Sequence, residues 1–410
     1  MRRRRFLARL SASALLWPAS VAALERRLAR VAGDEDRFWE AVRAAFLIPE
    51  DRIYLNTGTL GVPPRVVVDA VVEHGRRVAR SFPPALDRDT LADELGSLLG
   101  GDPAGFVFPR NTTEAMNFVA GGLELRAGDE VLTTDHEHIG GLCCWQLAAA
   151  RRGIRLRQLA IPATPDHDEQ LIEPFRRALG PRTRVISISH VNFTNGVVMP
   201  VRALIELARP RGIIVVVDGA HPPGLMPVDL RALDADFYAA SPHKWLLAPP
   251  GTGLLYLREE WRTRLWPTLA SGGWDDLTLG AGRLNHMGTL DESRLAGLLA
   301  AVRFHRAVGP ERVYERIRAL RGVLLEQLRG VPGVALITSA DPAASAGMVS
   351  FRPTRIEALA LQQRLADEAN IRTRVIGEYD YGWMRLSPHV YTSVAELQRT
   401  VRLIARAAAG

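Results

Sequence analysis

Short apolar runs alternate with helix-like segments through the middle of this 410-residue chain, and this rhythm constrains the fold more than any other feature. Between about residues 105 and 258 the runs read FVFPR, EVLTTD, RLRQLAI, RVISISHV, IIVVVDGAH, DFYAAS and TGLLYLR. Strands that alternate with helices are typical of α/β domains in which the sheet is mainly parallel. The run IIVVVDGAH is apolar on both faces, as expected of a buried central strand.

A second set of strand-like runs follows a long helical pattern. These runs are GVALIT, GMVSFRP, IRTRVI and WMRLSP, and helical stretches such as RIEALALQQRLADEAN separate them. Because one hydrophobic core rarely spans 410 residues, the sequence predicts two domains. We expect a large domain over residues 34–300, which includes an N-terminal segment, and a smaller α+β domain over residues 301–410.

Charge and cysteine usage exclude several classes of function. The formal net charge is +7, but four of the first five residues are arginine, and basic and acidic residues are interspersed beyond them. We therefore expect no nucleic-acid binding. Ring strain disfavours a bridge between the adjacent Cys143 and Cys144, so there is no disulfide framework. No CxxC or HExxH motif is present, and DHEH at residues 135–138 has no second ligand cluster, so we expect no metal site.

The first 23 residues have the layout of an export signal. MRRRRFLARLSASALLWPASVAA has a basic head, a short apolar stretch and small residues at its end. Arg3 and Arg4, with Phe6-Leu7 after them, resemble the twin-arginine motif, which predicts a periplasmic or secreted protein, with a cytoplasmic location as the alternative. The apolar stretch is too short for a stable membrane anchor. An amphipathic surface helix is the alternative interpretation.

Lys244, in the stretch SPHKWLLAPPGTG, is the only lysine among the 52 basic residues of the chain. Arginine replaces lysine wherever a solvated positive charge suffices, but a guanidinium stays protonated and cannot attack a carbonyl. A lysine amine can lose its proton and form a Schiff base. The retained lysine therefore indicates covalent chemistry, with an ordinary surface lysine as the alternative.

Polar residues that suit a charged ligand follow two of the expected strands. Asp218 ends the run IIVVVDGAH, and a buried carboxylate is costly unless a cation pairs with it. Thr112 and Thr113 begin a helix after FVFPR, where hydroxyls and free backbone N–H groups suit a phosphate. Taken singly, these residues could equally cap a turn and a helix. With Lys244 they meet the needs of pyridoxal phosphate, namely a Schiff-base lysine, an acid for the ring nitrogen and phosphate donors.

The motifs resemble the class V aminotransferase group of pyridoxal-phosphate enzymes, which includes cysteine desulfurases, kynureninases and isopenicillin N epimerase-like proteins. DGAH, followed by DFYAASPHKWLLAPPGTGLLYLR, carries most of this resemblance. It extends from IYLNTGTLGVPP at residues 53–64 to RLSPHVYTSVAEL at residues 385–397. The resemblance implies the fold-type-I architecture, a large domain with a mainly parallel sheet and a smaller C-terminal domain.

The resemblance also implies roles for individual residues around the cofactor. Lys244 corresponds to the Schiff-base lysine, Asp218 to the partner of the pyridinium nitrogen, and His138 in EHIGGLCCW to the histidine that stacks on the ring. Thr289 in HMGT corresponds to a threonine that reaches the phosphate from a neighbouring subunit, which predicts a homodimer with shared sites. Other positions that the resemblance assigns to cofactor binding are Thr112, Thr113, His221, Ser241 and His243.

On the substrate side, the resemblance points to arginines that bind a carboxylate. Arg385 heads the motif RLSPHVYTS, and Arg374 lies in IRTRVI. Bidentate pairing of a guanidinium with a carboxylate is the physical reason for this residue type. In a chain so rich in arginine, a surface charge is the alternative for Arg374. Asn56, in IYLNTG, is the third residue assigned to the substrate.

Two departures from the family pattern bear on the reaction. Desulfurases carry a reactive cysteine on the loop that here reads VIGEYDYGW, which has none, so we expect no desulfurase activity. Phe193 stands where desulfurases have an asparagine that contacts the ring, and Asn192, Thr194 or Asn195 could replace it.

The sequence therefore predicts a pyridoxal-phosphate enzyme that acts on an amino-acid or peptide substrate, with transamination as the first choice because it needs only one lysine. Alternatives within the family are an isopenicillin N epimerase-like epimerase, a C–X lyase, or an enzyme that tailors a secreted peptide or siderophore. An alternative of another class is an inactive binding protein on the same fold. A nicotinamide dehydrogenase is excluded because no GxGxxG motif follows an early strand.

Overall fold

Strand β6 (Ile214–Asp218), the expected central strand, lies in the middle of a seven-stranded sheet in the computed structural model, which describes residues 21–81 and 86–409. The five strands β3 to β7 run parallel, and β8 and β2 add antiparallel strands at one edge. The order across the sheet is β2 (Phe106–Val107), β8 (Leu254–Leu257), β7 (Phe237–Ala240), β6, β5 (Thr183–Ser189), β3 (Glu130–Thr134) and β4 (Arg155–Leu159). The prediction of a mainly parallel α/β sheet is confirmed.

Helices pack on both faces of this large sheet, which explains why β6 is apolar throughout. Val216 packs in one core cluster with residues of α6 and α7, whereas Val215 and Val217 pack in another with residues of α8 and α9. Successive side chains of a strand point to opposite faces, so a strand covered on both sides needs an uninterrupted apolar run. The helices are α6 (Thr112–Gly122), α7 (Ile139–Arg152), α8 (Glu169–Ala178), α9 (Val201–Ala208) and the short α10 (Leu230–Leu233).

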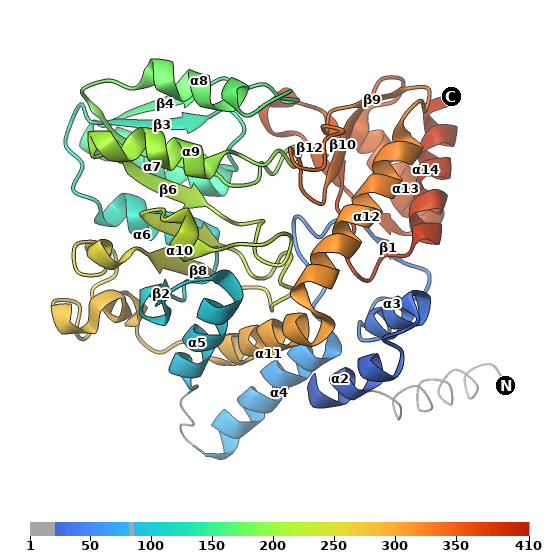
Figure 1. The fold of residues 1–410 in the computed structure, drawn as a ribbon, viewed down its shortest axis with the longest axis horizontal. Coiled ribbons are helices and arrows are strands. Elements are labelled where there is room, and N and C mark those ends of the chain that lie inside the picture. The colour runs from blue at the N-terminus through green and yellow to red at the C-terminus, as the bar shows by residue number, and fades with distance from the viewer. Residues whose placement is uncertain (1–20, 82–85, 410) are drawn as a thin grey trace.

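The C-terminal part of the chain forms a second, antiparallel sheet beside the first (Figure 1). Its core contains Leu361 and Leu365 of α13 (Ala358–Ala369) and Leu397 and Ile404 of α14 (Val394–Ala409), all of which are buried. The strand order is β12 (Arg374–Ile376), β13 (Trp383–Leu386), β10 (Val349–Pro353) and β9 (Val334–Leu336).

The N-terminal segment reaches across to this smaller sheet. Strand β1 (Ile53–Tyr54) pairs in parallel with β11 (Ile371–Arg372), and an isolated bridge joins Asn56 to Ser387. Residues just after β1 are therefore held against the C-terminal domain.

Long helices connect the two sheets and cover the lower part of Figure 1. Helix α11 packs against α4, α2 and α5, and α12 packs against α14. Short 3-10 helices occur in several connections. The bounds are α2 (Val21–Arg30), α3 (Glu35–Arg43), α4 (Arg65–Arg80), α5 (Arg88–Leu99), α11 (Ser293–Val308), α12 (Pro310–Leu328), η1 (Pro103–Gly105), η2 (Arg209–Arg211), η3 (Glu259–Trp261), η4 (Leu277–Asn285) and η5 (Glu378–Asp380).

The expected export signal is not tested by the structure. Residues 1–20, which include Arg3 and Arg4, lie outside the described residues, and only the last three residues of the 1–23 segment fall in α2. Within residues 21–81 and 86–409, no helix has the length and apolar character needed to cross a membrane.

Candidate active site

A cavity of about 500 Å³ opens where the parallel strands end, between the large sheet and the smaller one. Carboxyl ends of parallel strands are the usual ligand-binding edge of such sheets. A larger groove of about 630 Å³ lies along α4 and α11, but its charged side chains are exposed. The lining of the cavity at the strand ends contains nearly all the predicted site residues. The residues of the whole lining are Gly58, Thr59, Leu60, Asn111, Thr112, Thr113, His138, Gly140, Gly141, Ser189, Phe193, Asp218, Ala220, His221, Ser241, His243, Lys244, Pro250, Gly251, Arg374 and Arg385.

Lys244 extends into this cavity from the loop that follows β7. Burial lowers the pKa of its amine to about 8, the Asp218 carboxylate opposes this shift, and the Arg385 guanidinium adds to it. A close approach fixes the loop, because Gly61 N donates to His243 O at 2.8 Å and a Cβ at Gly61 would lie 1.9 Å from Lys244 O. The amine is therefore held in place and is far easier to deprotonate than an exposed lysine.

Asp218 stands at the end of β6, with its carboxylate buried in the cavity wall. Its Oδ1 accepts a hydrogen bond of 2.9 Å from Ala220 N. Burial raises the pKa of this carboxyl group, and the Lys244 ammonium opposes the shift. A Cβ at Gly141 would lie 2.7 Å from Asp218 Oδ2, so the start of α7 must carry glycine beside the carboxylate. A buried carboxylate of this kind needs a cationic partner, as a protonated pyridine nitrogen would provide.

Hydroxyl groups and helix α6 form the phosphate-binding corner that the sequence predicts. Ser241 Oγ lies 2.7 Å from Thr112 Oγ1 and accepts a hydrogen bond of 3.2 Å from Thr112 N. Thr113, at the start of the same helix, also lines the cavity, and a Cβ at Gly140 would lie 2.3 Å from its Oγ1. The helix N-terminus and the hydroxyls together suit a doubly charged anion.

Three histidines line the cavity with Lys244, and burial lowers their pKa values so that they are neutral. His138 caps α7 by accepting a hydrogen bond of 3.0 Å from Gly140 N at Nδ1, and burial together with the Lys244 charge lowers its pKa to about 4. Its ring meets Phe193 edge to face, with 5.0 Å between centroids. His243 Nδ1 donates to Thr252 O at 2.8 Å. His221 Nε2 lies 3.2 Å from Lys244 Nζ.

Two arginines face each other on the wall formed by the smaller sheet. Arg374 and Arg385 are direct partners in the register of β12 and β13, and both line the cavity. Arg385 is 2% exposed, donates to Phe193 O at 2.6 Å and to Thr59 Oγ1 at 3.0 Å, and keeps an unpartnered, buried Nε. Burial, with a further contribution from Arg374, lowers the pKa of Arg385 to about 9. Like charges placed opposite each other destabilise a sheet, so this pair suits an anionic ligand.

The structure does not bring every predicted residue to the cavity. Asn56 lies outside its lining, and its buried Oδ1 has no partner, whereas its neighbours Gly58, Thr59 and Leu60 do line the cavity. Thr289 is exposed and outside the lining, so its role across a subunit interface stays a prediction.

Three residues near Phe193 were candidates to replace the asparagine that contacts the ring in desulfurases. Phe193 itself lines the cavity, whereas Thr194 pairs with His136 and Asn195 donates to Ala163 O. Asn192 is buried without a hydrogen-bond partner for its side chain. None of the three residues belongs to the cavity lining.

Sequence reasoning missed a buried carboxyl group behind Asp218. Glu137 accepts hydrogen bonds of 2.7 Å from Thr134 Oγ1 and from Ser189 Oγ, and Ser189 lines the cavity. Burial, with a smaller contribution from the Asp218 charge, raises the pKa of Glu137 to about 7. The motif DHEH was the available signal, but it suggested only metal ligation, and the described residues contain no cluster of metal-ligating side chains.

The donor set fits pyridoxal phosphate on the observed geometry. A buried amine of low pKa, a buried carboxylate without a protein cation bonded to it, a hydroxyl-lined helix start and a neutral histidine all surround one cavity. These are the groups that this cofactor needs for its aldehyde, its ring nitrogen, its phosphate and its ring face. The fold and the site thus define a lysine-dependent pyridoxal-phosphate enzyme.

Comparison with known proteins places the chain in a family. The sequence model of the family Aminotransferase class-V matches residues 91–400, so the chain belongs to this family. It is 34% identical to "Isopenicillin N epimerase" of Streptomyces clavuligerus over 382 residues, which is 88% of this chain and 96% of that protein. It is 36% identical to the protein of the same name from Amycolatopsis lactamdurans, over 84% of this chain and 92% of that protein.

Proteins named as cysteine desulfurases or cystine lyases match as well. A "Cysteine desulfurase" of Klebsiella pneumoniae subsp. pneumoniae is 32% identical, over 76% of this chain and 82% of that protein. The solved structure of the cystine C-S lyase C-DES with its product cysteine persulfide has a TM-score of 0.79 and 27% identity, over 87% of this chain and 98% of that one. Another C-DES structure carries glycine covalently linked to its PLP cofactor. The chain is therefore a PLP-dependent enzyme of this family, which includes both epimerases and desulfurases.

Proposed function

We propose that this enzyme moves a proton at the Cα atom of an α-amino acid or of a peptide with a free amino-acid end, and that its outcome is transamination. The observation that carries the proposal is the position of the only lysine. Its amine, with a pKa of about 8, shares one cavity with Asp218, with the buried Arg385 and with the partly exposed Arg374. When bound, pyridoxal phosphate supplies an electron sink for the charge that develops at Cα.

Each wall of the cavity has its own part in this chemistry. Arg385 binds the substrate carboxylate through the N–H groups that Phe193 O and Thr59 Oγ1 do not occupy, and thereby directs Cα toward Lys244. Lys244 Nζ takes the Cα proton and holds it, since its pKa is near neutral. We propose that His138 and Phe193, which line the cavity and meet edge to face, help to exclude water from it.

Transamination is favoured by the single amine in the site. One base on one side can both remove a proton and return it to a neighbouring atom on the same side. Lys244 is the only lysine, and the neighbouring histidines have pKa values lowered by burial, so they are poor proton acceptors at neutral pH.

Epimerisation is the second candidate. The names of two relatives that match 88% and 84% of this chain favour it. It requires a second acid–base group on the side away from Lys244. Glu378 pairs with Arg374 of the cavity wall, its charge opposes the lowering of the His138 pKa, and one of its carboxylate oxygens is buried without a partner, but it does not itself line the cavity. This residue is our candidate for that group.

We further propose that the enzyme is not a cysteine desulfurase, although desulfurases are among its relatives. The loop that carries η5 has no cysteine. Neither Cys143 nor Cys144 lines the cavity, and burial raises the pKa of Cys144 to about 12. A thiol of this pKa is a poor nucleophile at neutral pH.

A substrate panel tests these proposals. The holoenzyme is incubated with amino acids and with peptides in deuterated buffer. Accumulation of the pyridoxamine form of the cofactor, with release of a keto acid, supports transamination. Deuterium at Cα with inversion and without net change supports epimerisation instead. Release of sulfide or persulfide from cysteine contradicts the exclusion of desulfurase activity, and release of ammonia from other substrates indicates elimination.

Two further proposals concern assembly and location. We propose a homodimer in which Thr289 reaches the partner's phosphate site, because the segment before it exposes several large apolar side chains, namely Trp266, Leu269, Trp274, Leu277 and Leu279. Light scattering gives the oligomeric state, and activity recovered on mixing a Lys244→Ala chain with a Thr289→Val chain indicates shared sites. We also propose twin-arginine export, which replacement of Arg3 and Arg4 by lysine should abolish in a reporter fusion.

A further inference from the structure

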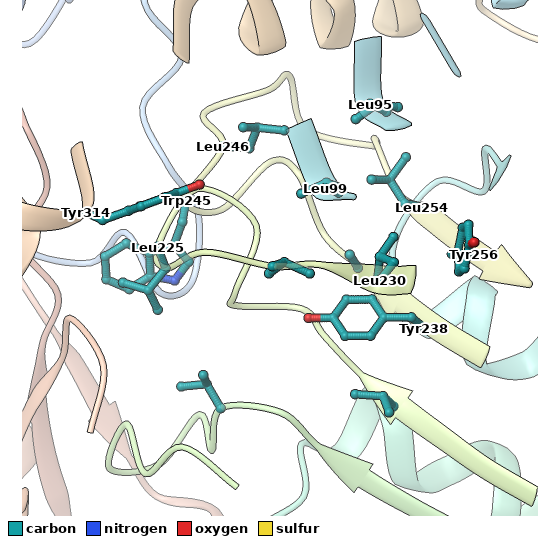
Figure 2. Close-up of a cluster of buried hydrophobic side chains, with 14 of the residues drawn as sticks. Leu95, Leu99, Leu225, Leu230, Tyr238, Trp245, Leu246, Leu254, Tyr256 and Tyr314 are labelled. Carbon is teal, nitrogen blue, oxygen red and sulfur yellow. The ribbon is translucent and has the colours of Figure 1, made fainter. Parts of the chain in front are cut away.

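Trp245, the residue next to the lysine, is completely buried and donates a hydrogen bond into the active site. Its exposed fraction is 0%, and its Nε1 lies 3.0 Å from His221 Nδ1. Figure 2 shows its indole in the buried hydrophobic cluster, close to Leu225 and Tyr314. The backbone is also fixed, since Trp245 O accepts a hydrogen bond of 2.9 Å from His389 Nε2. The indole nitrogen is therefore a fixed donor rather than a mobile one.

This contact determines where the proton of His221 resides. An indole N–H can only donate, so His221 Nδ1 must offer a lone pair. Neutral imidazole with a lone pair on Nδ1 carries its proton on Nε2. The imidazolium form is disfavoured as well, because burial and the nearby Lys244, Arg385 and His138 lower the pKa of His221 well below its usual value.

The proton on Nε2 is directed at the lysine. His221 Nε2 and Lys244 Nζ are 3.2 Å apart, a hydrogen-bond distance. The amine can accept this proton only when it is uncharged, since an ammonium group has three donors and no lone pair. The effects of the other charged groups on the pKa of the amine partly cancel, because Asp218 favours the ammonium form and Arg385 opposes it. His243 does not compete, since its Nδ1 is bonded to Thr252 O.

We propose that Trp245 is a positioning residue whose indole N–H fixes the tautomer of His221, so that Nε2–H faces Lys244 and favours the uncharged amine. With pyridoxal phosphate bound, the same tautomer would offer its Nε2–H to the cofactor as a hydrogen-bond donor. The inference rests on the proposed role of Lys244 as nucleophile and base. Its tautomeric part can nevertheless be measured without turnover.

The single lysine makes the test direct. Full-length, cofactor-free protein labelled with [ε-13C]lysine gives one lysine signal from the chain, so its pH titration reports the pKa of Lys244 without assignment. In Trp245→Phe, His221 can turn its lone pair toward the ammonium group. Because the uncharged amine loses a donor and the ammonium group gains an acceptor, we expect the pKa of Lys244 to rise by about one unit.

Trp145→Phe is the matched control. Trp145 is also 0% exposed, and its Nε1 donates to Ser187 Oγ at 2.9 Å, so the substitution removes the same kind of buried hydrogen bond at a site outside the cavity. It should leave the lysine titration unchanged. Equal shifts in the two variants would mean that the effect is general destabilisation, and would overturn the proposal.

Nitrogen-15 NMR of histidine-labelled protein reads the tautomer itself. In the native sequence, His221, assigned by its loss in His221→Gln, should show an unprotonated Nδ1 and a protonated Nε2, both without cofactor and in the holoenzyme. A protonated Nδ1 in the native sequence overturns the proposal, even if Trp245→Phe fails to fold. In His221→Gln, whose amide can rotate to accept, the lysine pKa should rise as in Trp245→Phe, and an unchanged value contradicts the inference.

These readouts separate this inference from the proposed function. If the tautomer and the lysine titration behave as expected but no substrate is turned over, the proposed function fails and the positioning role stands. If an amino acid is turned over while the tautomer is the opposite one, only the positioning role fails.

Discussion

On the large-domain wall of the cavity, Ser189, Asp218 and Ser241 come at or just after the ends of three neighbouring parallel strands, whereas on the small-domain wall Arg374 and Arg385 face each other across an antiparallel pair. The first wall is set by the register of one sheet and holds groups of opposite charge, Asp218 and Lys244. The second wall places like charges together and depends on segments from both ends of the chain. The difference suggests that the first wall performs the chemistry and the second selects the substrate.

The strongest test of this division replaces the amine on the large-domain wall. Lys244→Arg keeps the positive charge but cannot deprotonate, so we expect activity to fall by at least about 1000-fold. Borohydride reduction of the native holoenzyme followed by peptide mapping should label Lys244, and the variant should show no label. Labelling of another site in the native protein would show that the large-domain wall does not supply the reacting amine.

Asp218→Asn tests the carboxylate on the same wall. The amide is nearly the same size but cannot hold a proton on the pyridine nitrogen by its charge, so turnover should fall by about 100-fold. Asp236→Asn is the control, because Asp236 is equally buried but lies outside the cavity, where it accepts hydrogen bonds from Val215 N and Trp261 Nε1 and pairs with Arg258. We expect this control to lower the melting temperature and to leave the cofactor spectrum unchanged, and a similar spectral change in both variants would contradict the role of Asp218.

Conservative changes to the two arginines test whether the small-domain wall selects the substrate. Arg385→Lys removes a bidentate donor that is 2% exposed, and KM should rise about 10- to 100-fold while kcat changes less. Arg374→Lys should raise KM less than about tenfold, since its side chain is 39% exposed and already pairs with Glu378. If both variants instead reduce kcat with KM unchanged, the division between chemistry and selection is wrong.

The pH dependence of cofactor capture sharpens the comparison further. Only the uncharged amine condenses with pyridoxal phosphate, and the pKa of Lys244 is about 8. The rate of capture, followed by stopped-flow absorbance, should therefore rise about tenfold per pH unit below that value and level off above it. A rate that keeps rising beyond pH 10 would show an ordinary exposed amine.

The large-domain wall could be predicted from the sequence because each of its main residues is marked by the stretch of sequence around it. Asp218 ends an apolar run, and Lys244 is the one lysine in a chain of arginines. The small-domain wall was only partly predictable. Asn56 was expected at the substrate, but the turn after β1 brings Gly58 and Thr59 to the cavity instead. Trp245 and Glu137 were missed because their contacts, with His221 and Ser189, join residues far apart in the chain.

The pairing of β1 with β11 has a consequence for how the enzyme is made. Ile53 leaves the ribosome early, yet its partner Ile371 is synthesised near the end of the chain. Closing so long a loop comes late in folding, because its entropy is lost before non-local contacts compensate. A nascent chain can build the parallel sheet and display Lys244, but the wall with Thr59 and Arg385 is completed only after translation has nearly finished. Vitamin B6 loading in the cell should therefore be post-translational.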